Sequence, residues 1–132
     1  MRLGLRTIRI LRWGTAAVWL AFGLLAKVLS GVPRHRAIVG RVLGDTWAAP
    51  LTVVIGLGEI AMGAWILSGR APRACALAQT LAIGLMNSLE LTLARDLLAA
   101  PVGMVVLNLG FLGAGWVLAL AEVREDERCS PP

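Results

Sequence analysis

The stretch from Leu51 to Gly69, LTVVIGLGEIAMGAWILSG, constrains the fold more than any other part of the chain. Its residues are apolar or small, and Glu59 is its only ionisable group. The hydrocarbon core of a bilayer is ~30 Å thick and needs roughly 20 helical residues to cross it. A carboxyl group at that depth costs ~2.5–3.5 kcal/mol on insertion scales, so we expect it to face protein or water. Thr52, Gly56 and Gly63 share its helical face, and such small residues let helices approach closely. The stretch therefore predicts an inner helix of a membrane bundle.

Apolar stretches of similar length recur along the chain and predict an all-α, integral membrane four-helix bundle. We expect one transmembrane domain, residues 1–121, with spans at about residues 13–32, 48–69, 74–94 and 102–121. The basic amphipathic segment before the first span is expected to lie in the head groups. The charged residues 122–132 are expected to form a disordered cytoplasmic tail.

A shorter helix is predicted between the first two spans. Ile38 and Val39 have helical spacing there, but Arg36 and Arg41 make the segment too charged to cross a membrane. Pro33 precedes it, and the residue before a proline is disfavoured in helical geometry, so the first span should end there. We therefore expect a short interfacial helix.

Composition and charge agree with a bilayer location. Mean hydropathy is +0.76 and 16% of residues are charged, whereas soluble domains carry about 25%. The net charge of +5 would suit nucleic acid, but the basic residues flank apolar spans, where they would meet anionic lipid head groups. We therefore expect the lipid bilayer, and no nucleic acid, as a partner.

Counting Lys and Arg predicts the orientation. Four spans put eight of them on the side of both termini and five on the other side. Because cytoplasmic loops carry the excess of positive charge, both termini should be cytoplasmic in a bacterial plasma membrane. Trp13, Trp65 and Trp116 fall near the same ends of their spans, as expected of an aromatic belt.

Polar groups from all four spans are expected to lie in the outer half of the bilayer, at similar depths along helices that rise 1.5 Å per residue. They are Lys27, Glu59, Asn87, Glu90 and Asn108. If their faces converge, they form a polar pocket open to the outer side, with His35 and Arg36 at its mouth. Lys27 should then reach Glu59 or Glu90. Three interpretations remain open: helix-to-helix hydrogen bonding, a binding cavity for a quinone, lipid or small solute, and a proton relay.

Other chemistry finds little support in the sequence. Cys75 and Cys129 make no CxxC pair, and His35 is the only histidine. We therefore expect no metal site and no cofactor held by the chain alone, and we lean against an enzyme.

Three segments carry a resemblance to a known family: LRWGTAAVWLAFGLLAKVL, then VPRHRAIVGRVLGDTWAAPLTVVIGLGEIAMGAWILSG, then RAPRACALAQTLAIGLMNSLE. With a Gly-x3-Lys first helix, a PRH segment and a Gly-x-Gly-Glu second helix, the chain resembles the DoxX-like family of small bacterial membrane proteins. The resemblance implies a four-helix membrane bundle of mostly unassigned role and no settled catalytic residues.

The founding DoxX proteins are membrane subunits linked to quinone-dependent thiosulfate oxidation, and some DoxX-like segments are joined to NAD(P)-binding reductase domains. The resemblance therefore implies an accessory or ligand-binding subunit with a quinone- or NAD(P)-linked redox partner. The alternative is a binding or transport bundle for a quinone, lipid or small solute.

Overall fold

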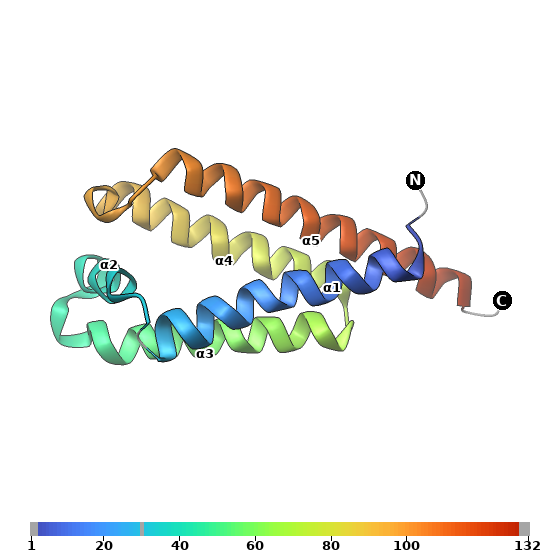
Figure 1. The fold of residues 1–132 in the computed structure, drawn as a ribbon, viewed down its shortest axis with the longest axis horizontal. Coiled ribbons are helices and arrows are strands. Elements are labelled where there is room, and N and C mark those ends of the chain that lie inside the picture. Colours follow the sequence, from blue (N-terminus) through green and yellow to red (C-terminus); the bar gives the residue numbers. More distant parts are fainter. Residues whose placement is uncertain (1–2, 30, 130–132) are drawn as a thin grey trace.

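The computed structural model describes residues 3–29 and 31–129, and within them the chain is helical and contains no strand (Figure 1). In chain order the elements are α1 (Leu5–Leu20), the π-helix η1 (Ala21–Val28), α2 (Pro33–Leu43), α3 (Asp45–Ser68), α4 (Pro72–Leu93), the 3₁₀-helix η2 (Arg95–Leu97) and α5 (Pro101–Cys129).

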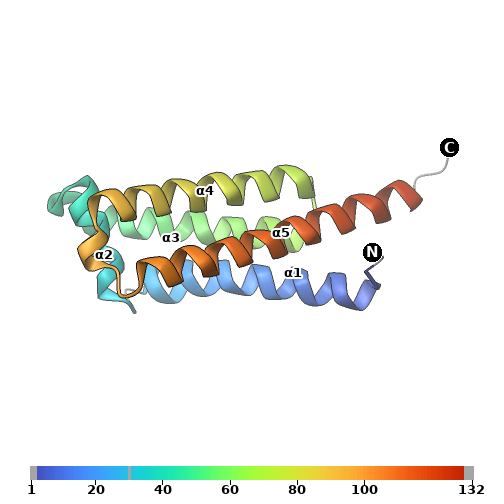
Figure 2. The same cartoon turned by 90° about the horizontal axis from the view of Figure 1, so that it is seen from above.

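Four of these helices are long and apolar enough to cross a membrane. They are α1 together with η1, α3, α4 and α5. They run side by side along the long axis, with α2 and η2 at one end and the two chain ends at the other (Figures 1 and 2). The predicted all-α four-helix bundle is confirmed, as is the short helix between its first two spans.

The turns between the helices follow from proline and glycine. Val32 is extended before Pro33, which starts α2, because a residue before proline avoids helical geometry. Gly69 ends α3 with φ +64°, a left-handed conformation that glycine adopts without strain, and Pro72 starts α4.

The side chains are arranged as a bilayer requires. The centre of the bundle holds few large residues, among them Trp19, Ile66 and Ile83. Large aliphatic side chains point outward instead, and Leu107 on α5 is 75% exposed. A contiguous apolar exterior of this kind is rare on soluble monomers and is normal against lipid.

Two boundaries differ from the sequence prediction. Helix α1 begins at Leu5, eight residues before the predicted start of the first span, and Ile8 in this added part packs into the core. Helix α5 continues to Cys129, so residues 122–129 are helical and not disordered. Glu122 is buried there and pairs with Arg12 of α1, which ties the end of α5 to the bundle. Residues 1–2, 30 and 130–132, including the rest of the predicted tail, lie outside the described residues.

Candidate functional site

The site begins with a close helix crossing between η1 and α3. A Cβ atom on Gly23 would lie 2.5 Å from the carbonyl oxygen of Gly56, and one on Gly56 would lie 2.7 Å from the carbonyl oxygen of Gly23. The backbones therefore touch at this point, and only glycine fits at either position. The crossing brings Lys27, one turn after Gly23, next to Glu59, one turn after Gly56.

Lys27 and Glu59 form a buried ion pair. The Lys27 Nζ atom donates to the Oε1 atom of Glu59 at 2.6 Å, and the two residues are 8% and 5% exposed. The expected contact between Lys27 and one of the two acids is therefore present. The second carboxylate oxygen of Glu59, Oε2, is also buried and has no hydrogen-bond partner in the described part of the chain. A buried acceptor without a donor costs about 1–3 kcal/mol, so the ion pair leaves one strong acceptor unused.

The backbone that carries Lys27 is a π-helix, Ala21–Val28, where the sequence predicted an ordinary transmembrane helix. Its wider turns continue past its end, where the amide of Gly31 donates to the carbonyl of Leu25 at 2.9 Å. Short π-helical segments are rare and are frequently found at functional sites. No proline marks the segment, so the sequence contains no clear signal for it.

Glu90 of α4 adds a second acid close to the ion pair. It is half-buried and interacts electrostatically with both Lys27 and Glu59. Two acids therefore lie near one lysine in this part of the bundle.

Asn87 and Asn108 meet each other and not the ion pair. The Nδ2 atom of Asn108 donates to Oδ1 of Asn87 at 2.7 Å, which joins α5 to α4. Both residues are half-buried. The five predicted pocket residues thus form two side-chain contacts, with Glu90 near the first.

His35 and Arg36 lie on α2, at the end of the bundle where η1 ends. The ring of His35 lies 6.2 Å from that of Phe22, and its Nδ1 atom is buried without a partner within the described residues. Burial lowers the pKa of His35 below its usual value, and the positive charges of Lys27 and Arg34 lower it further. A hydrogen bond to the Ala26 backbone acts in the opposite direction and raises the pKa. His35 is therefore harder to protonate than an exposed histidine, whereas Arg36 is exposed.

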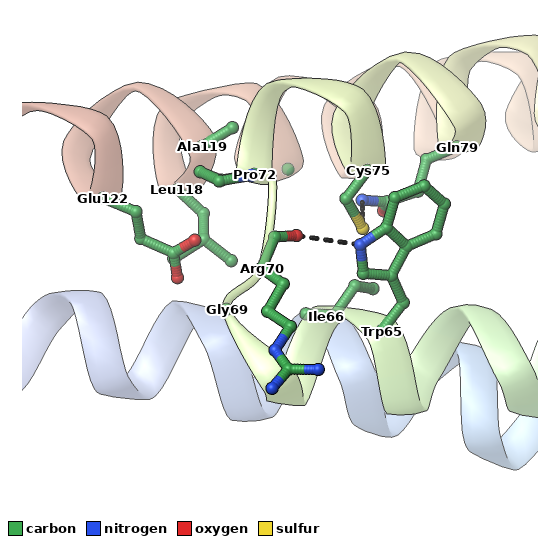
Figure 3. A pocket seen from close by; sticks show the side chains of 11 residues that line it. Trp65, Ile66, Gly69, Arg70, Pro72, Cys75, Gln79, Leu118, Ala119 and Glu122 are labelled. Atoms are coloured by element: carbon green, nitrogen blue, oxygen red, sulfur yellow. Dashed lines mark hydrogen bonds between the residues drawn. The ribbon is translucent and has the colours of Figure 1, made fainter. Parts of the chain in front are cut away.

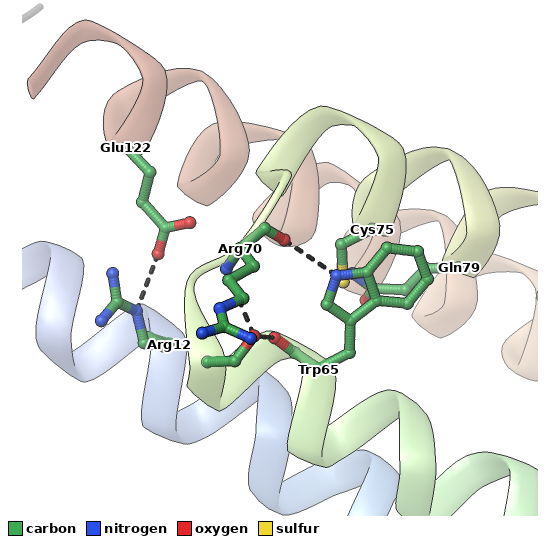
Figure 4. A network of polar contacts seen from close by, with 7 residues as sticks. Arg12, Trp65, Arg70, Cys75, Gln79 and Glu122 are labelled. Carbon is green, nitrogen blue, oxygen red and sulfur yellow. Dashed lines mark hydrogen bonds and ion pairs between the residues drawn. The ribbon is translucent and has the colours of Figure 1, made fainter. Parts of the chain in front are cut away.

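A second polar network, which was not predicted from the sequence, lies towards the end of the bundle with both termini (Figure 4). The Nε atom of Arg12 donates to Oε1 of Glu122 at 2.8 Å, and Glu122 is 8% exposed. Nearby, Gln79 accepts a hydrogen bond from Trp19 at 3.0 Å and donates to the Cys75 sulfur at 3.7 Å. The signal in the sequence is the helical spacing between Glu122 and the apolar residues before it, which indicates that the last helix continues past residue 121.

A cavity of about 10 Å³ lies beside this network, where the α3–α4 turn meets α5 (Figure 3). Trp65, Cys75, Gln79 and Glu122 are among its lining residues. That volume is about one water molecule, too small for a metabolite. None of the five predicted pocket residues lines it.

Four apolar helices of membrane-spanning length around a buried ion pair define a membrane protein of the helix-bundle class. The family model of the DoxX-like family matches residues 16–116. The chain therefore belongs to the DoxX-like family. The matched region contains both halves of the Lys27–Glu59 pair, but neither Arg12 nor Glu122. A search of curated proteins and a search of solved structures each found no match.

Proposed function

We propose that the protein is an accessory membrane subunit that binds the ring of a quinone or quinol at the Lys27–Glu59 pair. The observation that carries the proposal is the buried Oε2 atom of Glu59, which has no donor among the residues that the structure describes, although Glu59 is only 5% exposed. Ionisable residues inside a membrane are costly and mark functional sites by default.

The two sides of the ion pair match the two oxidation states of such a ring. The ammonium of Lys27 has three N–H donors, one of which is used on Glu59, so it can also donate to a quinone carbonyl. The unused oxygen of Glu59 accepts the O–H of a quinol. The apolar tail of the ligand would lie along the exposed aliphatic side chains of the bundle.

Helix packing alone does not require a buried ion pair. The same bundle joins α4 to α5 through two neutral amides, Asn87 and Asn108. Interhelical hydrogen bonds of that kind stabilise a bundle by ~0.6 kcal/mol each. They do so without the cost of removing two charges from water. A buried ion pair is a poor source of stability, because the desolvation penalty can exceed the Coulombic gain.

The accessory role is suggested by the small number of side chains that could hold a redox centre, one histidine and two cysteines. Electrons exchanged with a bound quinone would therefore pass to a partner protein, for which an NAD(P)-linked or quinone-linked reductase is the expected class. In this arrangement the chain lies in a bacterial plasma membrane with both termini in the cytoplasm and the ion pair in the outer half of the bilayer. A binding bundle without such a partner is the alternative.

The test is purification in mild detergent, followed by solvent extraction and mass spectrometry of quinones. We expect the wild-type protein to retain quinone and the double variant Lys27→Met with Glu59→Gln to lose it. The matched control is Asn87→Leu with Asn108→Leu, which removes the neutral interhelical pair and should keep the ligand. A wild-type protein that neither retains nor takes up added ubiquinone would contradict the proposal, as would equal retention by the double variant. A reductase that co-purifies in fixed ratio would support the accessory role, and its absence would favour the alternative.

A further inference from the structure

A groove of about 590 Å³ lies between the start of α1 and the end of α5. These two segments reach beyond the α3–α4 turn, at the end of the molecule that holds both termini (Figures 1 and 2). Ile8 contributes to one wall, and residues of α5 from Val117 onward form the other. The groove shares no residue with the Lys27–Glu59 pair, so its function is independent of the proposed quinone site.

The polarity of the groove changes along its length. Its α5 wall begins with Val117, Leu120 and Ala121, and continues with Arg124 and Glu127. At 1.5 Å per residue the apolar and charged parts together span about 15 Å. The apolar part is nearer the middle of the bilayer and the charged part is nearer water. That order matches a phospholipid standing in the leaflet, with its chains beside the aliphatic residues and its head group beside the charges.

The charges at the open end are of both signs. Arg124 and Glu127 are exposed, and within residues 3–29 and 31–129 neither takes part in an ion pair, whereas Arg128 and Glu125 pair with each other at 3.4 Å. Residues three apart on a helix have Cβ atoms about 5–6 Å from each other. An ethanolamine phospholipid presents an anionic phosphate and a cationic ammonium at a similar separation. Arginine binds phosphate through paired N–H donors, and a carboxylate accepts from the ammonium.

We propose that this groove binds an ethanolamine phospholipid of the leaflet on the side of both termini. The phosphate lies against Arg124, the ammonium against Glu127, and an acyl chain along Val117 and Leu120. An anionic phospholipid without an ammonium group fits less well, because it offers no cation to Glu127 and places a net negative charge beside the glutamates that line the groove. The bound lipid fills the space between α1 and α5 and stabilises their contact.

The first test is native mass spectrometry of delipidated protein titrated with phosphatidylethanolamine or phosphatidylglycerol. We expect one tightly bound phosphatidylethanolamine and weaker binding of phosphatidylglycerol. Arg124→Gln and Glu127→Gln should each weaken the phosphatidylethanolamine affinity about tenfold, as expected for loss of a charge-assisted contact. The matched control is Arg73→Gln, an exposed arginine near the same end that does not line the groove, and it should leave the affinity unchanged.

The second test identifies the occupant in native membranes. A photo-reactive residue placed at Ala121, inside the groove, should form an adduct with the mass of an ethanolamine phospholipid. An adduct with a second copy of the chain or with another protein would overturn the proposal. Equal affinities for the two lipids, unaffected by Arg124→Gln, would also overturn it, because they describe ordinary boundary lipid.

Discussion

Replacing Lys27 by methionine tests whether the buried ion pair is a coupled unit. The variant keeps the volume of the side chain but, among the described residues, leaves both carboxylate oxygens of Glu59 without a partner, and the neighbouring acid Glu90 remains. Removing one member of a buried pair costs about 3–5 kcal/mol. Because the 2.6 Å contact is almost wholly buried and the neighbouring acid repels, we expect a loss at the upper end of that range.

Glu59→Gln should cost less, about 1–3 kcal/mol, because the amide oxygen still accepts from Lys27. The double variant removes both buried charges and leaves a neutral amide at position 59, so we expect its free energy of unfolding to return to within about 1–3 kcal/mol of the wild type, the cost of an unsatisfied buried polar group. The coupling free energy would then be about 3 kcal/mol or more.

The measurement is a double-mutant cycle of the free energy of unfolding in detergent micelles, read together with quinone retention. A parallel cycle on Asn87 and Asn108 gives the reference for simple interhelical hydrogen bonding, ~0.6 kcal/mol. We expect the Lys27–Glu59 double variant to recover stability and not ligand. Additive single effects, or a double variant that still holds quinone, would refute the reasoning.

The remaining predictions concern the crossing, the histidine and the orientation. Gly56→Val should destabilise the protein by about 2 kcal/mol or more in the same unfolding assay, because the helices must move apart, while Gly58→Ala, which faces open space, should be close to neutral. Because the pKa of His35 is lower in the folded protein than in the unfolded chain, the unfolded chain binds a proton at a higher pH. The free energy of unfolding should therefore fall as the pH drops below about 6.5, the pKa of an unfolded histidine. Unfolding measured against pH should show this fall, and His35→Gln should remove it. A cysteine at Ala37 should be labelled from outside intact cells and one at Arg73 should not, and the reverse pattern would invert the predicted orientation.

The local features of this chain could be predicted because they depend on short stretches of sequence. A run of apolar residues long enough to span a bilayer predicts a transmembrane helix wherever it occurs, and the dense charges around Arg36 predict that α2 cannot be one. The position of Glu59 near the middle of α3 also follows from its place in the run. The small residues on the helical face of Glu59 predicted a close neighbouring helix, and the contact at Gly56 confirms it.

Which polar groups meet was decided only in three dimensions. Both Glu59 and Glu90 lie at depths that Lys27 can reach, and the contact between Gly23 and Gly56 selects Glu59 by fixing the rotation and separation of two helices. The π-helical turn that carries Lys27 and the burial of Glu122 against α1 are likewise products of packing. Span and depth are properties of one helix and can be read along the chain. The rotation of a helix about its axis depends on the surface of its neighbour, which no single stretch of sequence contains.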